Sequence, residues 1–174
     1  MTLILSGTDG LSDVDGSAAT PAIRGTDANT GIYFPGADRI GFAEGGVQVG
    51  EFDASGNFLM NSGYGSPAIA YGCRAWVNFN GTGTVAIRAS GNVTSITDNG
   101  TGDYTINFTT AMVDANYAFS VGFDNFNNAY PRVAALYGET PTASALRLKN
   151  SYTSTFGSVQ TFEDTPRFTV AVFR

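Results

Sequence analysis

Apolar and polar residues follow two different patterns along the chain. In residues 66–174, apolar residues recur at every second position in short runs, such as Tyr104, Ile106 and Phe108. A period of two is typical of a strand with one buried face, because successive side chains point to opposite sides of a sheet. The pattern predicts nine strands, at residues 75–79, 85–89, 93–97, 104–108, 117–123, 132–137, 145–150, 159–162 and 168–173.

Turn residues separate these predicted strands. The Asn-Gly pair between Asp98 and Asp103 favours a type I′ hairpin turn, and the segment from Ser90 to Asn92 suggests a second hairpin. No stretch keeps helical spacing over three turns. Many short strands joined by tight turns predict an all-β fold, with an antiparallel, jelly-roll-like β-sandwich in residues 66–174.

Residues 1–65 show a different pattern. Their apolar residues come in short bursts, each separated from the next by Gly, Asp, Asn or Pro, at residues 32–34, 40–42, 47–49, 52 and 58–60. Strands this short cannot bury a core by themselves. Either they pack on something larger, or several copies of the chain wind together into an intertwined segment. A four-residue echo between residues 20–23 and 66–69 suggests modular construction.

Charge narrows the classes of partner. The net charge is −6, and only 14% of the residues are charged. Nucleic-acid binding needs a basic track, which the nine scattered Lys and Arg residues do not form. No apolar run approaches the length of a membrane span, and residues 1–5 do not resemble a signal peptide. We therefore expect no nucleic-acid binding, no membrane insertion and synthesis in a cytoplasm.

The sequence offers little for catalysis or metal binding. It has no histidine and one cysteine, which removes Ser-His-Asp and Cys-His designs, and its acidic residues lie mostly in turns. The segment from Asp13 to Gly16 resembles the start of a calcium loop, but an EF-hand would place Leu11 where a carboxylate is needed. We expect no enzyme, no metal site and no cofactor. We also expect a buried thiol at Cys73, and core or intersubunit packing for Trp76 rather than an exposed platform.

The segment from Asp124 to Tyr130 is the best candidate for binding. Aromatic rings stack on the apolar faces of sugars, and Asn side chains both donate and accept hydrogen bonds. An ordinary long hairpin loop is the alternative interpretation. If the segment binds a saccharide, the expected contact residues are Asn125, Phe126, Asn127, Asn128 and Tyr130.

About forty residues from Arg74, beginning "RAWVNFNGTGT", resemble the C-terminal region of bacteriophage tail fibre proteins, and the final "FTVAVFR" is similar to that family's terminal strand. Upstream, residues 20–46 and "FDASGNFLM" are similar to the shaft-like repeats that precede such domains. Val113 departs from the pattern, because related fibres often carry proline there. The resemblance implies a structural virion protein, usually trimeric, that reaches the host surface. The family has no catalytic residues to assign to this chain. The receptor-contacting loops of such fibres are variable, so the resemblance assigns no contact residue either.

The resemblance and the residue patterns together lead to one leading hypothesis. Residues 1–65 are an attachment and shaft segment bound to tail or baseplate proteins, and residues 66–174 are a tip domain. We therefore expect a homotrimeric tail fibre, located in the virion tail, whose tip contacts a host surface receptor, with a saccharide favoured over a protein. The alternative is a purely structural short fibre or baseplate decoration without a receptor. A capsule depolymerase is a distant third hypothesis.

Overall fold

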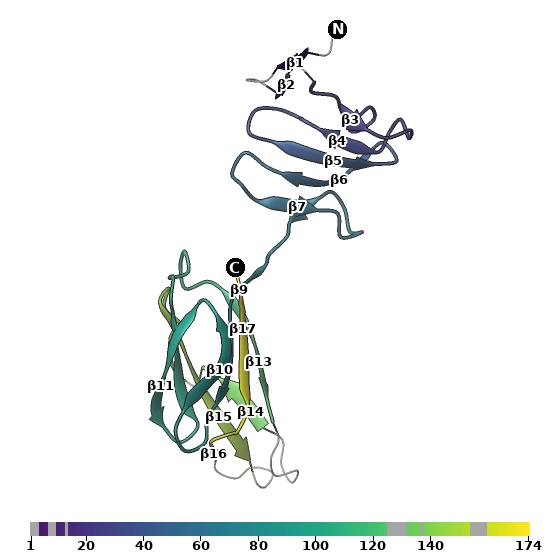
Figure 1. Cartoon of the computed structure of the whole chain (residues 1–174). Coiled ribbons are helices and arrows are strands. Elements are labelled where there is room, and N and C mark those ends of the chain that lie inside the picture. The colour runs from purple at the N-terminus through teal and green to yellow at the C-terminus, as the bar shows by residue number, and fades with distance from the viewer. Residues whose placement is uncertain (1–3, 7–9, 13, 125–131, 137, 154–159) are drawn as a thin grey trace. The chain divides into compact units, whose positions relative to one another are not determined.

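A computed structural model describes residues 4–6, 10–12, 14–124, 132–136, 138–153 and 160–174. The chain divides into two compact units, unit 1 of residues 1–70 and unit 2 of residues 71–174. The described residues contain strands and no helix (Figure 1), and the strands of every sheet pair antiparallel. The prediction of an all-β, antiparallel chain is therefore confirmed.

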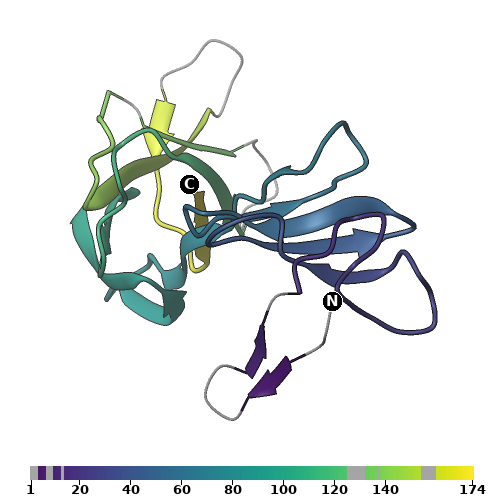
Figure 2. The same cartoon turned by 90° about the horizontal axis from the view of Figure 1, so that it is seen from above.

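Unit 1 consists of a hairpin and one meandering sheet. Strands β1 (Ile4–Ser6) and β2 (Gly10–Ser12) form the hairpin (Figure 2). The other six strands pair in their order along the chain: β3 (Ile23–Arg24), β4 (Gly31–Tyr33), β5 (Ile40–Glu44), β6 (Val47–Phe52), β7 (Phe58–Met60) and β8 (Ala68–Ile69). The echoed segments 20–23 and 66–69 thus end in the two edge strands, β3 and β8.

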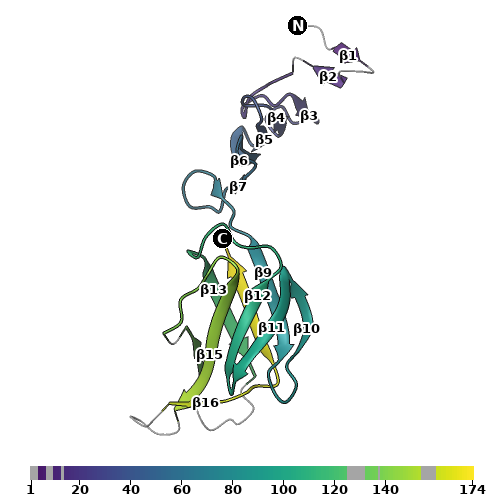
Figure 3. The same cartoon turned by 90° about the vertical axis from the view of Figure 1, so that its left-hand side faces the viewer.

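Unit 2 contains one four-stranded and one five-stranded sheet (Figure 3). One has the order β10-β9-β17-β13, and the other has the order β11-β12-β15-β14, with β16 also paired to β15. All nine predicted strands are present: β9 (Cys73–Asn80), β10 (Ala86–Gly91), β11 (Val93–Gly100), β12 (Asp103–Phe108), β13 (Ala118–Phe123), β14 (Arg132–Ala135), β15 (Ala145–Thr153), β16 (Gln160–Phe162) and β17 (Phe168–Phe173).

The two sheets of unit 2 share one hydrophobic core. The rings of Phe79 and Phe168 from the first sheet stack with centroids 5.2 Å apart, and Tyr104 from the second sheet meets Phe79 edge-on at 5.1 Å. Ile106 and Leu148 extend the core along the second sheet and are also fully buried. The alternation seen in the sequence therefore identified the inward faces of β12 and β17 correctly.

The two predicted turns differ from expectation. Residues 98–103 do form a hairpin, but the positive φ angles fall on Gly100 and Gly102 rather than on Asn99, so the turn is not type I′ at Asn-Gly. Tertiary contacts select this form, because Gly102 N donates to Asp164 Oδ1 at 2.7 Å. The segment Ser90–Asn92 is not a hairpin turn. It carries the chain from one sheet to the other, with Asn92 in the left-handed region at φ 56°.

Two expectations for β9 also need correction. Cys73 is exposed rather than buried, because it lies at the first position of the strand, outside the core. Trp76 is 44% exposed and therefore does not belong to the core of the single chain. The alternation of β9 explains this, since Ala75, Val77 and Phe79 occupy the inward positions. Packing of Trp76 between subunits stays a prediction.

Candidate functional site

The predicted binding residues, Asn125, Phe126, Asn127, Asn128 and Tyr130, lie outside the described residues. Asp124, the last described residue before them, is held firmly. Its backbone N donates to Arg167 O at 3.1 Å, and its backbone O accepts from Thr165 Oγ1 at 3.1 Å. The prediction that this segment contacts a saccharide stays a prediction.

The outer face of the β11–β12–β15 sheet is rich in polar and charged side chains. The period of two that buries Tyr104 and Ile106 places Asp103, Thr105 and Asn107 on the opposite face of β12. Lys149 lies across from Asp103, and Arg147 lies across from Thr105. Residues at alternating positions of the neighbouring strands β12 and β15 thereby form a continuous polar surface.

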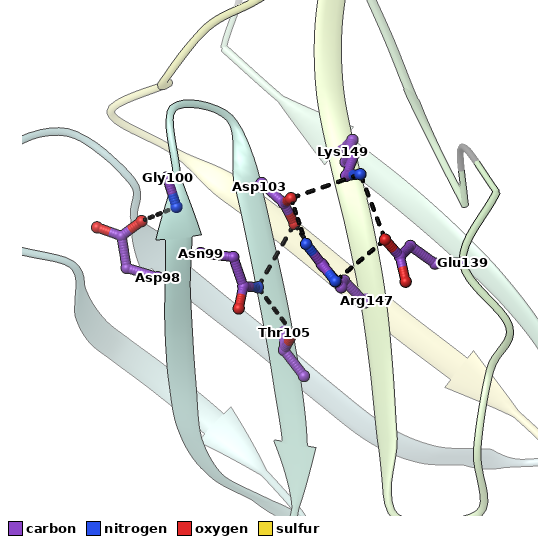
Figure 4. Close-up of polar contacts among 8 residues, drawn as sticks. All are labelled: Asp98, Asn99, Gly100, Asp103, Thr105, Glu139, Arg147 and Lys149. Carbon is purple, nitrogen blue, oxygen red and sulfur yellow. Dashed lines mark hydrogen bonds and ion pairs between the residues drawn. The ribbon is translucent and has the colours of Figure 1, made fainter.

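Four charged side chains form a closed network on this surface (Figure 4). Arg147 donates to Asp103 twice, from Nε to Oδ1 at 2.8 Å and from Nη2 to Oδ2 at 2.7 Å. Glu139 Oε1 lies 3.0 Å from Arg147 Nη1 and 3.3 Å from Lys149 Nζ, and Lys149 Nζ lies 3.6 Å from Asp103 Oδ2. With two acids and two bases, the network is electrically neutral at pH 7.

The network stabilises the charged form of the Asp103 carboxylate, which disfavours proton transfer at this group. The hydrogen bonds from Arg147 lower the pKa of Asp103 below its ordinary value, and the same pair raises the pKa of Arg147. A general acid or base near neutral pH needs the opposite shift for a carboxylate. The arrangement therefore suits positioning and hydrogen bonding rather than acid–base chemistry.

Neutral amides and hydroxyls continue the surface toward β11. Asn107 Nδ2 donates to Ser95 Oγ at 3.1 Å and to Thr97 Oγ1 at 2.9 Å. Asn99 Nδ2 donates to Thr105 Oγ1 at 2.9 Å (Figure 4). These side chains bond across the hairpin and so fix its surface groups in one arrangement.

A buried network lies beneath the hairpin tip. The hydroxyl of Tyr104 lies 2.9 Å from Gly81 O and 2.7 Å from Asp164 Oδ1, the oxygen that also accepts from Gly102 N. Burial raises the pKa of Tyr104 well above its ordinary value. The same end of unit 2 contains Asp124, because Thr165 O accepts from Gly81 N while Thr165 Oγ1 donates to Asp124 O. The hairpin tip and the start of the predicted loop are thus tied to one network.

The sequence interpretation missed the charged network. Arg147 and Lys149 stand two residues apart in "ALRLKN", between inward-facing leucines, so their shared face was readable. Their acidic partners could not be predicted in the same way. Glu139, for example, belongs to a segment between strands, and no periodicity in the sequence predicts where that segment lies. Within the described residues no group of three or more His, Cys, Asp or Glu side chains is arranged to hold a metal ion. The same residues contain no helix long and apolar enough to cross a membrane.

Comparisons of the chain with protein-family models, curated proteins and solved structures gave no match.

Proposed function

We propose that this chain is a structural tail fibre protein of a bacteriophage virion. Residues 1–65 attach it to the tail or baseplate, and residues 66–174 form a jelly-roll-like β-sandwich tip. Three copies form the fibre, and the tip contacts a saccharide on the host surface without enzymatic activity. The resemblance in sequence supports this proposal, and the structural observation that carries it is the open apolar face of the unit 1 sheet.

The apolar face consists of side chains that share one side of strands β3 to β8. Ile40 pairs with Phe52, and Phe52 pairs with Phe58, so three large apolar residues lie in one cross-strand row. The rings of Phe52 and Phe58 have centroids 5.2 Å apart. These side chains and others of the face are more than two-fifths exposed in the single chain: Ile23, Ile40, Phe52, Phe58 and Met60.

The opposite face of the same sheet contains a buried acid, Glu51. Glu51 is 1% exposed and accepts from Arg39 Nε at 2.5 Å, from Arg39 Nη2 at 2.9 Å and from Gln48 Nε2 at 2.6 Å. The hydroxyl of Tyr33 in turn donates to Gln48 Oε1 at 2.9 Å. Sheets are stable in water when an apolar face is buried. Here the apolar face with Phe52 and Phe58 is open, while Glu51 on the other face is buried. This inversion favours partner chains on the apolar face.

Other copies of this chain are the simplest partners for the apolar face, because no second protein has to be assumed. Each copy presents the same face, so a closed ring of copies buries all of them at once. Burying a large apolar side chain stabilises a protein by about 1.5–3 kcal/mol. In a single chain, the five exposed apolar side chains of this face lack part of that stabilisation. We therefore place the subunit contact of the shaft on this face.

Light scattering on the purified full chain tests the trimer. The expected mass is that of three chains of 18.2 kDa. Phe52→Ser should raise the concentration needed for assembly at least tenfold. Tyr64→Ser is the matched control, because Tyr64 is 90% exposed and lies outside the six strands. A wild-type chain that stays monomeric at micromolar concentration contradicts the proposed assembly.

Two further measurements test the role in the virion. Gold-labelled antibodies against the chain should decorate the tail in electron micrographs of the particle that carries it. The purified chain should compete with particles for adsorption to host cells. Tail labelling without competition would favour the purely structural component. Labelling that is absent from the tail would reject the tail fibre proposal.

A further inference from the structure

A groove of about 490 Å³ lies on the outer face of the β10-β9-β17-β13 sheet. Neighbouring strands β9, β17 and β13 line it, and none of its nine lining residues is charged. Six of these residues belong to the outward positions of the strands: Trp76, Asn78, Ser120, Gly122, Thr169 and Ala171. The volume falls within the range of about 300–1,000 Å³ that is typical of small-molecule sites.

The strand register explains why the surface is hollow there. Trp76 pairs with Ala171, which pairs with Ser120, so two small side chains stand beside one large ring. In the next row Asn78 pairs with Thr169, which pairs with Gly122. The indole itself lies over Gly91 of β10, where an added Cβ would come within 2.4 Å of Trp76 Nε1. Trp76 therefore forms the wall toward β10, and the small residues form the floor.

Polar groups of the groove can form further hydrogen bonds with a ligand. Oδ1 of Asn78 is buried, and no donor in the described part of the chain reaches it. Rotation of this amide toward a ligand therefore breaks no hydrogen bond at its oxygen. Ser120 is exposed in the same floor. Thr169 Oγ1 donates to Gly122 O at 3.0 Å, which leaves its lone pairs available as acceptors.

We propose that this groove binds one pyranose ring of a neutral saccharide, stacked on Trp76 and hydrogen-bonded by Asn78 and Ser120. An indole face next to amide and hydroxyl groups matches a ring with one apolar face and polar edges. A neutral ligand fits because the lining is uncharged and the chain carries a net charge of −6, whereas an anionic sugar finds no cation there. The inference rests on the proposed receptor-binding function and assigns it a second site, apart from residues 125–130.

The fluorescence of Trp76 tests the proposal directly, because it is the only tryptophan of the chain. Full-length protein is titrated with glucose, galactose, mannose, N-acetylglucosamine and N-acetylgalactosamine, and with glucuronate as the charged control. At least one neutral sugar should change the emission saturably, with a millimolar Kd, while glucuronate leaves it unchanged. The absence of a saturable change with all neutral sugars overturns the proposal, as does tighter binding of glucuronate.

A groove-filling variant locates the sugar while keeping the reporter. Ala171→Leu places a larger side chain beside Trp76 and should raise the Kd at least tenfold. Ala111→Leu is the matched control, because Ala111 is exposed and does not line the groove. Both variants should keep the wild-type mass in light scattering and the wild-type urea midpoint. An unchanged Kd for Ala171→Leu overturns the proposal.

Two other outcomes separate this inference from the proposed function. If Ala171→Leu or Trp76→Ala lowers the oligomeric state, the face lies between copies of the chain and the sugar site is rejected. If wild-type protein and Trp76→Ala compete equally with particles for host adsorption, the groove inference fails while the receptor function stands. If wild-type protein does not compete at all, the receptor function fails, and the fluorescence titration still decides whether the groove binds sugar.

Discussion

Arg147 of β15 holds Asp103 of β12 by two parallel hydrogen bonds of 2.8 and 2.7 Å, at the end of the sheet where the β11–β12 hairpin turns. The carboxylate is largely shielded, with 13% of its side chain exposed, whereas Arg147 is 36% exposed. Two-bonded arginine–carboxylate pairs fix geometry as well as charge. This pair therefore joins β15 to the hairpin that presents the polar surface.

The pair makes the stability of unit 2 sensitive to acid. The pKa of Asp103 is lowered in the folded state, first by the Arg147 hydrogen bonds, whereas the unfolded chain takes up its proton near pH 3.9. The stabilisation is therefore complete above about pH 4 and is lost as the pH falls further. Asp103→Asn should lower the free energy of unfolding at pH 7 by about 1–2 kcal/mol, after allowance for the exposure of Arg147.

Urea denaturation across a series of pH values measures this effect. The difference between wild type and Asp103→Asn should shrink as the pH falls below about 4. Glu44→Gln is the control, since it removes an exposed carboxylate from the other unit. A difference that stays constant down to strongly acidic pH would show that the Asp103 charge contributes nothing.

The fold was predictable where one rule governs many residues. Several strands of unit 2 follow from alternation, as in β12, where Ile106 and Phe108 are buried and the residues between them lie on the opposite face. Trp76 shows where composition misleads. An isolated tryptophan suggests a core, but its position in the alternation of β9 places it outside, next to the small residues Ala171 and Ser120 that belong to distant parts of the chain.

The polar contacts were less predictable because they depend on how strands pair. Asn92 was predicted to lie in a hairpin turn, but it lies where the chain passes from one sheet to the other. Its amide donates to Arg74 O and Thr110 O, each eighteen residues away. The link between Gly102 and Asp164 spans sixty-two residues and decides the form of the hairpin turn. A local Asn-Gly signal cannot contain that information, since the competing partner lies elsewhere in the sequence.

Gly102 should not tolerate a side chain. Its φ of +66° belongs to the left-handed region, and an added Cβ would lie 2.6 Å from Asn150 O. Gly102→Ala should therefore lower the free energy of unfolding by at least about 2 kcal/mol, from backbone strain and the clash together. Gly72→Ala in the same unit is the control, because an added Cβ meets nothing within 4 Å there. Equal urea midpoints for the two variants would contradict this account of the hairpin.

Phe126→Ala tests the loop that the sequence singled out. A ring among asparagines on a loop is expected to be exposed, and stacking on a sugar would give it a function. Three tethered copies raise a weak single-site affinity. The substitution should abolish adsorption to host cells and leave the melting temperature nearly unchanged. Loss of folding would instead identify Phe126 as a core residue, and unchanged adsorption would place the receptor site elsewhere, with Trp76→Ala as the next variant to compare.

Unit 2 should fold without unit 1, whereas unit 1 should not fold alone as a monomer. The continuous core of buried residues lies entirely within residues 71–174, with Phe79, Tyr104, Phe168 and Leu148 at its centre. In the part of unit 1 that the structure describes, the buried apolar side chains are Tyr33 and Ala43, and the apolar sheet face is open.

Separate expression of residues 71–174 and 1–70 tests this asymmetry. The longer fragment should unfold cooperatively in urea and keep the stability loss caused by Gly102→Ala, because Asn150, Glu163 and Asp164, which lie against Gly102, belong to it. The shorter fragment should show a cooperative transition only at concentrations where it assembles, so its midpoint should rise with protein concentration. A concentration-independent transition of monomeric residues 1–70 would show that the open face needs no partner, and the proposed trimer contact would then have to lie elsewhere.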